Sequence, residues 1–213
     1  MIRGMIFDLD GTLVDSRLDY PAIKRDLGLP ANIAILEALA EIPAGPEKDV
    51  MLAKLRVHER RGAECATLFP GVVEMLAFLD ERAVPTAVLT RNSRESTGIV
   101  LERLRLRFSK VLSREDAPPK PDPAGLLHIA EVWNLPPASV AFCGDFLFDL
   151  HAGQAAGMTT VLYAPGELPP YAGEADHVLR CFTEFPAWWE RYGSNRETAN
   201  VDRLRFRDSS GCL

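Results

Sequence analysis

Two pairs of aspartates follow apolar runs in this sequence, and the closer pair gives the first chemical hypothesis. Asp8 and Asp10 stand at the end of the apolar run Gly4 to Leu9, and Gly11 then lets the chain turn. Side chains two residues apart in a strand project on the same side, so these carboxylates repel each other when both are ionised. A shared proton or a bound divalent cation offsets that repulsion. The pattern therefore indicates proton exchange or a cation site rather than a solvated turn.

A second acidic pair, Asp145 and Asp149, follows the apolar run Val140 to Cys143. The carboxyl ends of parallel strands meet at one edge of a sheet, where ligands bind in open α/β sheets. We therefore expect both pairs to surround one cation, with Asp8, Asp10, Asp145 and Asp149 as candidate ligands. Mg²⁺ fits a site of carboxylates, waters and phosphate better than Zn²⁺, which prefers His and Cys. Asp149 has the alternative role of capping the helix that follows.

Thr90 and Lys120 are candidate partners for an anion at the same edge. Thr90 follows a strand-like run, and Asn92 with Glu95 resembles a capping box that opens a helix. A helix N-terminus preceded by a hydroxyl is suited to anion binding. Lys120 stands between two prolines that fix the backbone. A lysine in such a rigid loop indicates that it balances the charge of a phosphoryl group and of the carboxylates.

Short apolar runs alternate with segments of helical periodicity along most of the chain. This alternation predicts an α/β fold with a parallel sheet and crossover helices. The predicted strands are Gly4–Leu9, Thr86–Leu89, Val111–Leu112, Val140–Cys143, Thr160–Tyr163 and His177–Leu179. The predicted crossover helices are residues 71–82, 93–106, 123–134 and 147–157.

Residues 15–68 interrupt the alternation, because they read as successive helices with no strand between them. The predicted helices are residues 20–27, 33–42 and 47–64. We therefore expect a small all-helical cap, residues 15–68, inserted after the first strand of a core formed by residues 1–14 and 69–192. Residues 193–213 are polar and aperiodic, which predicts a flexible C-terminal tail.

Composition narrows the class of protein. The 213 residues carry a net charge of -6, which argues against nucleic acid or an anionic membrane as a partner. No run of 18 predominantly apolar residues occurs, and early acidic residues interrupt any signal-peptide core. The cysteines have no metal-ligand spacing, which is typical of reduced thiols. We expect a cytoplasmic enzyme that acts on a small molecule as a monomer or weak homodimer.

Four motifs occur in order along the chain. They are Asp8-Leu9-Asp10-Gly11-Thr12-Leu13-Val14-Asp15-Ser16, then Thr90-Arg91-Asn92, then Lys120-Pro121-Asp122-Pro123, and finally Gly144-Asp145 to Asp149 with residues 152–157. With these motifs the chain resembles the haloacid dehalogenase superfamily, in its phosphoglycolate-phosphatase-like branch with an inserted helical cap. The resemblance covers roughly residues 1 to 190 and implies a Rossmann-like, three-layer core.

The resemblance also implies a chemistry: Mg²⁺-dependent hydrolysis of small phosphate monoesters through a phosphoaspartate, with phosphoglycolate or a sugar phosphate as candidate substrates. Asp8 would be the nucleophile that attacks phosphorus in line. Asp10 would protonate the leaving alkoxide and then activate water. Thr90 and Lys120 would hold the phosphoryl oxygens.

The resemblance assigns the metal ligands as well. Mg²⁺ would be held by Asp8, the backbone carbonyl of Asp10, and Asp145, with Asp149 orienting metal-bound waters. The apolar run Phe146-Leu147-Phe148 directly after Asp145 predicts a more hydrophobic pocket wall than is usual in this branch.

Substrate-binding residues are expected near the motifs. Arg17 and Tyr20 stand just beyond the first motif, where the cap would hinge, and Arg91 and Asn92 belong to the second motif. The short cap predicts an open entrance and a broad or bulky substrate.

Two other functions use the same residue types. A phosphosugar mutase would use Asp8 and Asp10 identically and differ only in passing the phosphoryl group to a sugar hydroxyl instead of water. A receiver-like phosphosignalling module also combines an acidic Mg²⁺ site with a phosphoaccepting Asp, a Thr and a Lys. The paired aspartates on the first strand and the inserted helices argue against the signalling module.

Overall fold

The computed structural model describes residues 1–193 and is built on a six-stranded sheet whose neighbouring strands all run parallel. The strand order is β5-β4-β1-β6-β7-β8. The strands are β1 (Gly4–Phe7), β4 (Thr86–Leu89), β5 (Lys110–Leu112), β6 (Val140–Gly144), β7 (Thr159–Tyr163) and β8 (His177–Leu179). These are the strands that the apolar runs predicted, so the α/β class and the parallel sheet are confirmed.

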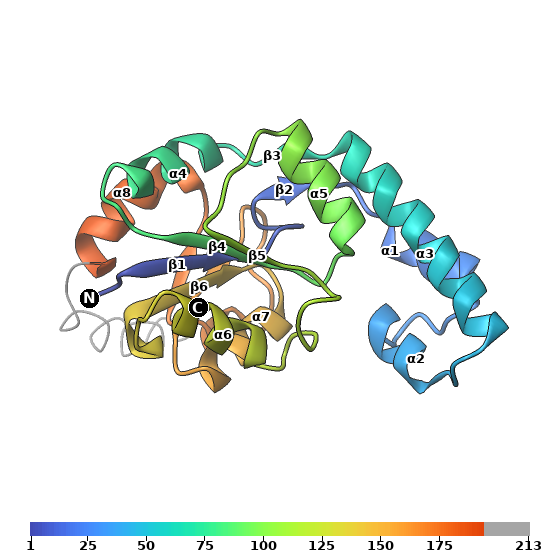
Figure 1. Ribbon diagram of the computed structural model, residues 1–213. Helices are drawn as coiled ribbons and strands as arrows, with labels where there is room; N and C mark the ends of the chain where they lie inside the picture. The colour runs from blue at the N-terminus through green and yellow to red at the C-terminus, as the bar shows by residue number, and fades with distance from the viewer. Residues whose placement is uncertain (194–213) are drawn as a thin grey trace, which may run out of the picture. The chain divides into compact units, whose positions relative to one another are not determined.

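Helices cover both faces of this sheet and give it three layers (Figure 1). One face carries α4 (Val72–Asp80) and α8 (Phe185–Trp188), and the other carries α6 (Ala124–Val132) and α7 (Leu147–Ala155). Shorter turns of helix are η1 (Pro137–Ser139), η2 (Ala172–Glu174), η3 (Phe182–Glu184) and η4 (Trp189–Gly193). Within residues 1–193, no helix combines the length and the hydrophobicity that a membrane span requires.

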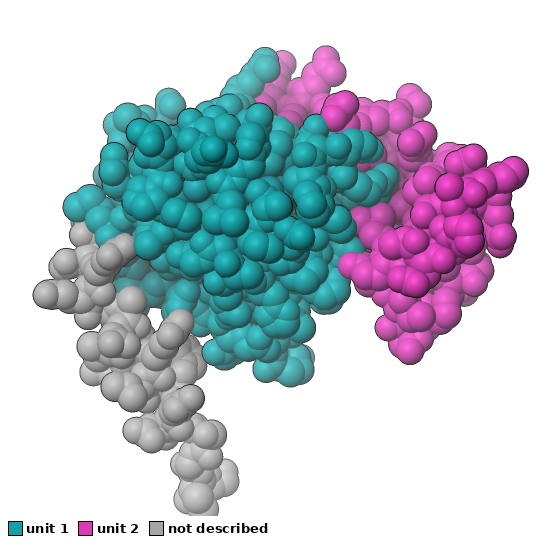
Figure 2. Space-filling view, turned by 60° about the horizontal axis from the view of Figure 1, so that its bottom comes forward, with its two compact units in different colours: residues 1–15, 68–91, 107–213 teal, residues 16–67, 92–106 magenta. Residues whose placement is uncertain are grey.

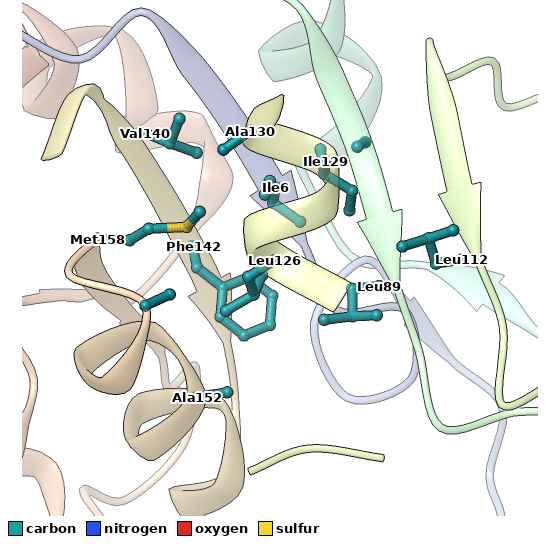
Figure 3. Packing of buried hydrophobic residues seen from close by; sticks show 12 residues of the cluster. Ile6, Leu89, Leu112, Leu126, Ile129, Ala130, Val140, Phe142, Ala152 and Met158 are labelled. Atoms are coloured by element: carbon teal, nitrogen blue, oxygen red, sulfur yellow. The ribbon is translucent and has the colours of Figure 1, made fainter. Parts of the chain in front are cut away.

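The face covered by α6 and α7 buries an aliphatic cluster. Ile6 of β1 stands in register with Ala87 on β4 and with Phe142 on β6, so the three side chains form a row across the sheet. The other buried members of the cluster are Leu89, Leu112, Leu126, Ile129, Ala130, Val140, Ala152, Ala156 and Met158 (Figure 3). Strand alternation thus directs every second side chain of β1 toward these helices.

The opposite face is packed by aromatic rings. Phe7 meets Phe182 edge-on at a centroid distance of 6.5 Å, and Tyr163 of β7 stacks on Phe182 at 4.4 Å. Phe78 of α4 packs edge-on against Phe185 of α8 at 6.0 Å. These ring contacts fix α4 and the C-terminal helices on the sheet.

The chain forms two compact units (Figure 2). Residues 1–15, 68–91 and 107 onward carry the sheet, and residues 16–67 with 92–106 form a helical unit. The helices of that unit are α1 (Tyr20–Asp26), α2 (Ile35–Glu41), α3 (Pro46–Cys65) and α5 (Arg94–Arg103). Every helix predicted from periodicity is present, with ends within three residues of those predicted.

The grouping of α5 differs from the sequence analysis, which placed this helix among the crossover helices of the core. Arg103 of α5 donates to the carbonyl oxygens of Ala63 and Ala66 at the end of α3. Glu95 at the start of α5 pairs with Arg60 of α3 at 3.5 Å. These contacts tie α5 to α3, and periodicity along one helix carries no information about which neighbour it will pack against.

The interior of the helical unit is a second aliphatic cluster. Its buried members come from all three inserted helices or the turn after α1, and they are Ile23, Leu27, Ile35, Leu39 and Leu55. Asp26 ties α1 to α3 at the surface, because its carboxylate pairs with Lys54 at 3.2 Å and with His58 at 3.0 Å. The helical unit therefore has a core of its own.

Two short strands were missed by the sequence analysis, which expected no strand in the inserted segment. β2 (Val14–Asp15) and β3 (Thr67–Leu68) form a two-stranded sheet at its two ends. The N–H of Phe69 also donates to the carbonyl of Leu13 at 3.1 Å. The pairing of the entering and leaving chains gives their backbone groups hydrogen-bond partners. A two-residue strand has no periodicity from which to predict it.

The C-terminal end of the described chain is the helical turn η4, which closes at Gly193. The N–H of Ile2 donates to the carbonyl of Gly193 at 2.8 Å, so this turn is joined to the chain just before β1. The rest of the predicted flexible tail, residues 194–213, lies outside the described residues.

Adjacent leucines on α6 provide a test of the core. Leu126 is fully buried in the aliphatic cluster, whereas Leu127 is 40% exposed. Leu126→Ala should lower the free energy of unfolding by about 2 to 5 kcal/mol, because it removes buried methyl groups and leaves a cavity. Leu127→Ala should cost less than about 1 kcal/mol. Urea unfolding of both variants measures the difference, and equal losses would contradict the assignment of Leu126 to the core.

Candidate active site

Asp8 lies directly beyond β1, between the ends of β4 and β6. Its N–H donates to the carbonyl of Cys143 on β6 at 2.8 Å, which continues the strand pairing past Phe7. Its Oδ1 accepts a hydrogen bond from Lys120 Nζ at 2.6 Å. The same Nζ lies 2.6 Å from Asp149 Oδ1. One buried lysine therefore bridges two buried carboxylates.

The loop between β5 and α6 delivers Lys120 to this position. The lysine side chain is only 3% exposed, and its ammonium lies 5.5 Å from the centroid of the Phe142 ring. Asp122 Oδ1 accepts a hydrogen bond from the N–H of Ala124 and so closes the turn into α6. Lys120 was predicted to balance charge, and the structure brings it onto Asp8 and Asp149.

Asp145 and Asp149 come from the end of β6 and the first turn of α7. The capping role of Asp149 is present, because its Oδ2 accepts from the N–H of Phe146 at 3.0 Å. Its Oδ1 faces Lys120, and its role at a metal stays a prediction. Oxygens of Asp8, Asp145 and Asp149 all lie within 4.8 Å of one another. The predicted convergence of β1 and β6 on one acidic group is thus present.

This group of oxygens fits a hard divalent cation. Carboxylate oxygens, with no nitrogen or sulfur donor in the group, are the kind of ligand that Mg²⁺ prefers. Gly11 leaves room beside them, because a Cβ at that position would lie 2.3 Å from Asp145 Oδ2. The positive φ of 81° at Gly11 also favours glycine there. The Asp10 carboxylate does not belong to the group of three. The role predicted for Asp10, metal binding through its backbone carbonyl, stays a prediction.

A tight turn after β1 positions Asp10 and Thr12. The N–H of Gly11 donates to the carbonyl of Val14 at 2.8 Å, and Asp10 forms a bridge with the same residue. Thr12 Oγ1 donates to Asp145 Oδ1 at 3.3 Å. Thr12 belongs to the first motif, and the structure shows that it orients a candidate metal ligand.

Burial and mutual repulsion dominate the electrostatics. Burial, together with the Asp149 carboxylate, raises the pKa of Asp8 to about 7 even though Lys120 opposes the change. Burial and the charges of Asp8 and Asp149 raise the pKa of Asp145 to about 8. Burial alone would lower the pKa of Lys120, but Asp149 and Asp8 raise it above its usual value. Near neutral pH the metal-free site therefore holds a cationic lysine and keeps protons on Asp8 and Asp145 instead of a full set of negative charges.

The second motif follows β4, the other neighbour of β1. Thr90 is buried, and its N–H donates to the carbonyl of Leu112 at 3.0 Å. The guanidinium of Arg91 lies over the ring of Phe148, with Cζ 4.9 Å from the ring centroid. These positions place the motif at the same edge of the sheet as Asp8, as predicted.

The capping role predicted for Asn92 is wrong. Ser93 is the N-cap of α5, and its hydroxyl accepts from the N–H of Ser96. Asn and Ser are both good N-cap residues, so the sequence pattern alone did not distinguish Asn92 from Ser93. Asn92 belongs to the helical unit together with Arg17 and Tyr20, both of which are exposed. Substrate binding by these three residues stays a prediction.

Tyr171 is a residue of the site that sequence reasoning missed. It lies in the segment between β7 and β8, and its hydroxyl donates to the backbone carbonyl of Asp145 at 3.2 Å. Its ring meets the ring of Phe146 edge-on at 5.9 Å. A single tyrosine in a loop carries no motif, so nothing in the sequence indicated this contact.

Comparisons with known proteins agree with this geometry. Residues 2–157 match the family described as haloacid dehalogenase-like hydrolase. A haloacid dehalogenase-like hydrolase domain-containing protein of Arabidopsis thaliana is 32% identical over 174 residues, which cover 76% of this chain and 70% of that protein. An N-acetylmuramic acid 6-phosphate phosphatase of Pseudomonas putida is 31% identical over 191 residues, 79% of this chain and 86% of that protein. A phosphoglycolate phosphatase of Chromobacterium violaceum is 30% identical over 210 residues, 86% of this chain and 94% of that protein.

Solved structures show the same fold. A hydrolase from Pseudomonas syringae matches with a TM-score of 0.73 at 22% identity, over 90% of this chain and 100% of that chain. A HAD-superfamily hydrolase of subfamily IA, variant 1, from Geobacter sulfurreducens matches with a TM-score of 0.64 at 26% identity, over 88% and 100%. Because the family match covers most of the chain and includes the carboxylates and the lysine described above, this chain belongs to the haloacid dehalogenase-like hydrolases.

Proposed function

We propose that this chain is a Mg²⁺-dependent phosphatase that hydrolyses small phosphate monoesters through a phosphoaspartate formed on Asp8. The observation that carries the proposal is the position of Lys120 Nζ, which lies 2.6 Å from Asp8 and from Asp149, two members of the group of three carboxylates. A nucleophilic carboxylate needs nearby positive charge before a phosphate ester, which is itself anionic, can approach. The lysine supplies part of that charge.

Asp8 is the proposed nucleophile. A bond forms between a carboxylate oxygen of Asp8 and phosphorus, while the bond from phosphorus to the ester oxygen breaks. Lys120 stays fully charged and holds the nucleophile in one orientation. The hydrogen bond from the Asp8 N–H to β6 holds the Asp8 backbone in place, so the carboxylate keeps its direction of attack on phosphorus.

Asp10 is the proposed general acid and base. It donates a proton to the leaving alkoxide in the first step and takes a proton from the attacking water in the second, so each step restores the state that the other requires. The turn from Asp10 to Val14 is fixed by two backbone contacts, which holds this side chain directly after the nucleophile.

Asp8, Asp145 and the backbone carbonyl of Asp10 are the proposed Mg²⁺ ligands, with Asp149 acting through water. The cation would neutralise charge on the phosphoryl oxygens. Thr12 keeps Asp145 oriented, and Thr90 is proposed to donate to a phosphoryl oxygen from the neighbouring strand end. Arg17, Tyr20, Arg91 and Asn92 are proposed to contact the remainder of the ester.

The named relatives support the reaction class. One is a phosphoglycolate phosphatase and another an N-acetylmuramic acid 6-phosphate phosphatase. Both names specify a phosphate monoester, and they differ in the alcohol that carries the phosphate. The shared part of these substrates is the part that Asp8 and Lys120 would contact.

Substitution of the two motif aspartates tests the mechanism. Asp8→Asn should abolish phosphate release from p-nitrophenyl phosphate with Mg²⁺ present, because an amide does not form the phosphoenzyme. Asp10→Asn should lower kcat about 10²- to 10⁴-fold through loss of the general acid and base. Asp116→Asn, which changes a carboxylate in the loop after β5, is the matched control. Full activity of Asp8→Asn would reject the proposal.

The raised carboxylate pKa values predict how stability varies with pH. Between about pH 4 and pH 8 the folded, metal-free protein holds protons on Asp8 and Asp145 that the unfolded chain has released. The free energy of unfolding of the metal-free protein should therefore fall as pH rises through this range. Mg²⁺ should restore stability most at pH 8, where the ligands ionise readily.

Urea unfolding at pH 5 and pH 8, with Mg²⁺ and with EDTA, measures this effect. The Asp145→Asn variant should show a shallower loss with pH and little stabilisation by Mg²⁺, because it lacks one titrating carboxylate and one candidate ligand. A metal-free protein that becomes more stable from pH 5 to pH 8 would contradict the prediction.

A further inference from the structure

Three aromatic rings cluster beside the site, and we name Phe146, Phe148 and Tyr171 the aromatic rim. Phe146 meets Phe148 edge-on at 5.2 Å and Tyr171 edge-on at 5.9 Å. Phe146 is 50% exposed, although a phenylalanine gains most when it is buried. The rim therefore presents apolar ring surface to solvent at the edge of the sheet where the catalytic groups lie.

The sheet order locates this surface relative to Asp8. Arg91 follows β4 and Phe148 follows β6, and β1 lies between these two strands. The guanidinium of Arg91 nevertheless lies over the Phe148 ring. The contact therefore joins residues that follow the two strands flanking β1, beyond which Asp8 stands. Phe148 and Arg91 thus form a bridge beside the proposed phosphoryl position.

The backbone holds the rim close to the candidate metal ligands. The N–H of Phe146 donates to Asp149, and the hydroxyl of Tyr171 donates to the carbonyl of Asp145. The segment that carries Tyr171 is fixed in turn, because Glu174 pairs with His151 at 2.9 Å. The rings are therefore set in position before any ester binds.

We propose that the aromatic rim binds the ring of the substrate's alcohol, so that this site prefers phosphate monoesters whose leaving group carries a flat-faced ring. This inference rests on the proposed phosphatase function and names its substrate class. Phe148 directly precedes Asp149, whose carboxylate lies within 4.8 Å of Asp8, so we place the alcohol of a phosphoryl group held at Asp8 near the bridge of Phe148 and Arg91. Aromatic rings and the hydrogen-bearing faces of sugars both pack on phenylalanine, whereas a short ringless acid has no face to offer.

The ratio of two specificity constants tests the proposal. We would measure kcat/KM with Mg²⁺ for 1-naphthyl phosphate, glucose 6-phosphate and phosphoglycolate. The wild type should favour at least one ring-bearing ester over phosphoglycolate. Phe148→Leu should reduce that preference about threefold to tenfold, mainly through KM, because the ring contact is present in both the ground state and the transition state. Phe148→Tyr should retain the preference.

Phe78→Leu is the matched control, because Phe78 of α4 also lies beneath an arginine, with Arg82 Cζ 3.5 Å from its ring centroid. This substitution should leave the ratio between esters as in the wild type. A loss confined to the naphthyl ester assigns the rim to aryl rings, and a loss confined to glucose 6-phosphate assigns it to sugars. An unchanged ratio in Phe148→Leu, or an equal change in Phe78→Leu, would overturn the proposal.

Binding without turnover separates this inference from the proposed function. Calorimetry on the Asp8→Asn variant compares 1-naphthyl phosphate with methyl phosphate. Tighter binding of the naphthyl ester, lost when Phe148→Leu is added, supports the rim even if the wild type hydrolyses none of the esters, a result that would reject the phosphatase alone. Equal affinities for the two esters would reject the rim.

Discussion

The buried contact between Lys120 and the carboxylates of Asp8 and Asp149 is the constraint around which the site is organised. Carboxylates gathered at one edge of a sheet repel, and burial removes the water that would screen them. The lysine offsets that repulsion from a rigid loop, and breaking such a buried pair typically costs about 3 to 5 kcal/mol because one charge is left without compensation. The same contact thus holds the three side chains in position and compensates their charges.

The sheet brings these groups together through strand order and side-chain alternation. Asp8 is two residues beyond Ile6, so its side chain points to the same face of the sheet as Ile6, the face covered by α6 and α7. Lys120 stands in the loop that enters α6, and Asp149 stands in the first turn of α7. The helices that cover the aliphatic cluster therefore also begin near the lysine and the carboxylate that lie at the carboxyl end of β1.

Much of this arrangement could be predicted from the sequence, because the apolar strands and the polar residues that follow them are local signals. Asp8 and Asp145 each carry such a signal, whereas Lys120 was predicted from the prolines around it, and the structure brings all three to one site. The partners of Tyr171 and the grouping of α5 could not be predicted in this way. Both depend on contacts between segments far apart in the chain, where one sequence gives no register.

Chemically similar neighbours set a second limit on prediction. Asn92 and Ser93 are both good N-cap residues, and only the backbone conformation decides that Ser93 takes this position. The same limit applies to β2 and β3, since two-residue strands form through the partner they meet rather than through their own composition. Sequence patterns thus predict which helices and long strands form better than they predict where a helix begins or which short strands pair.

The hydrogen bonds from Arg103 to the end of α3 have a consequence for the modularity of this chain. The helical unit is discontinuous, so the backbone passes between the two units after residues 15, 67, 91 and 106. Two of these crossings fall before the last residue of the first and second motifs, between Asp15 and Ser16 and between Arg91 and Asn92. Excision of residues 16–67 would therefore leave α5 without the helix it packs on, in a segment that begins two residues beyond Thr90. The helical unit thus consists of two separate segments of the chain and is not a single insertion that could be removed alone.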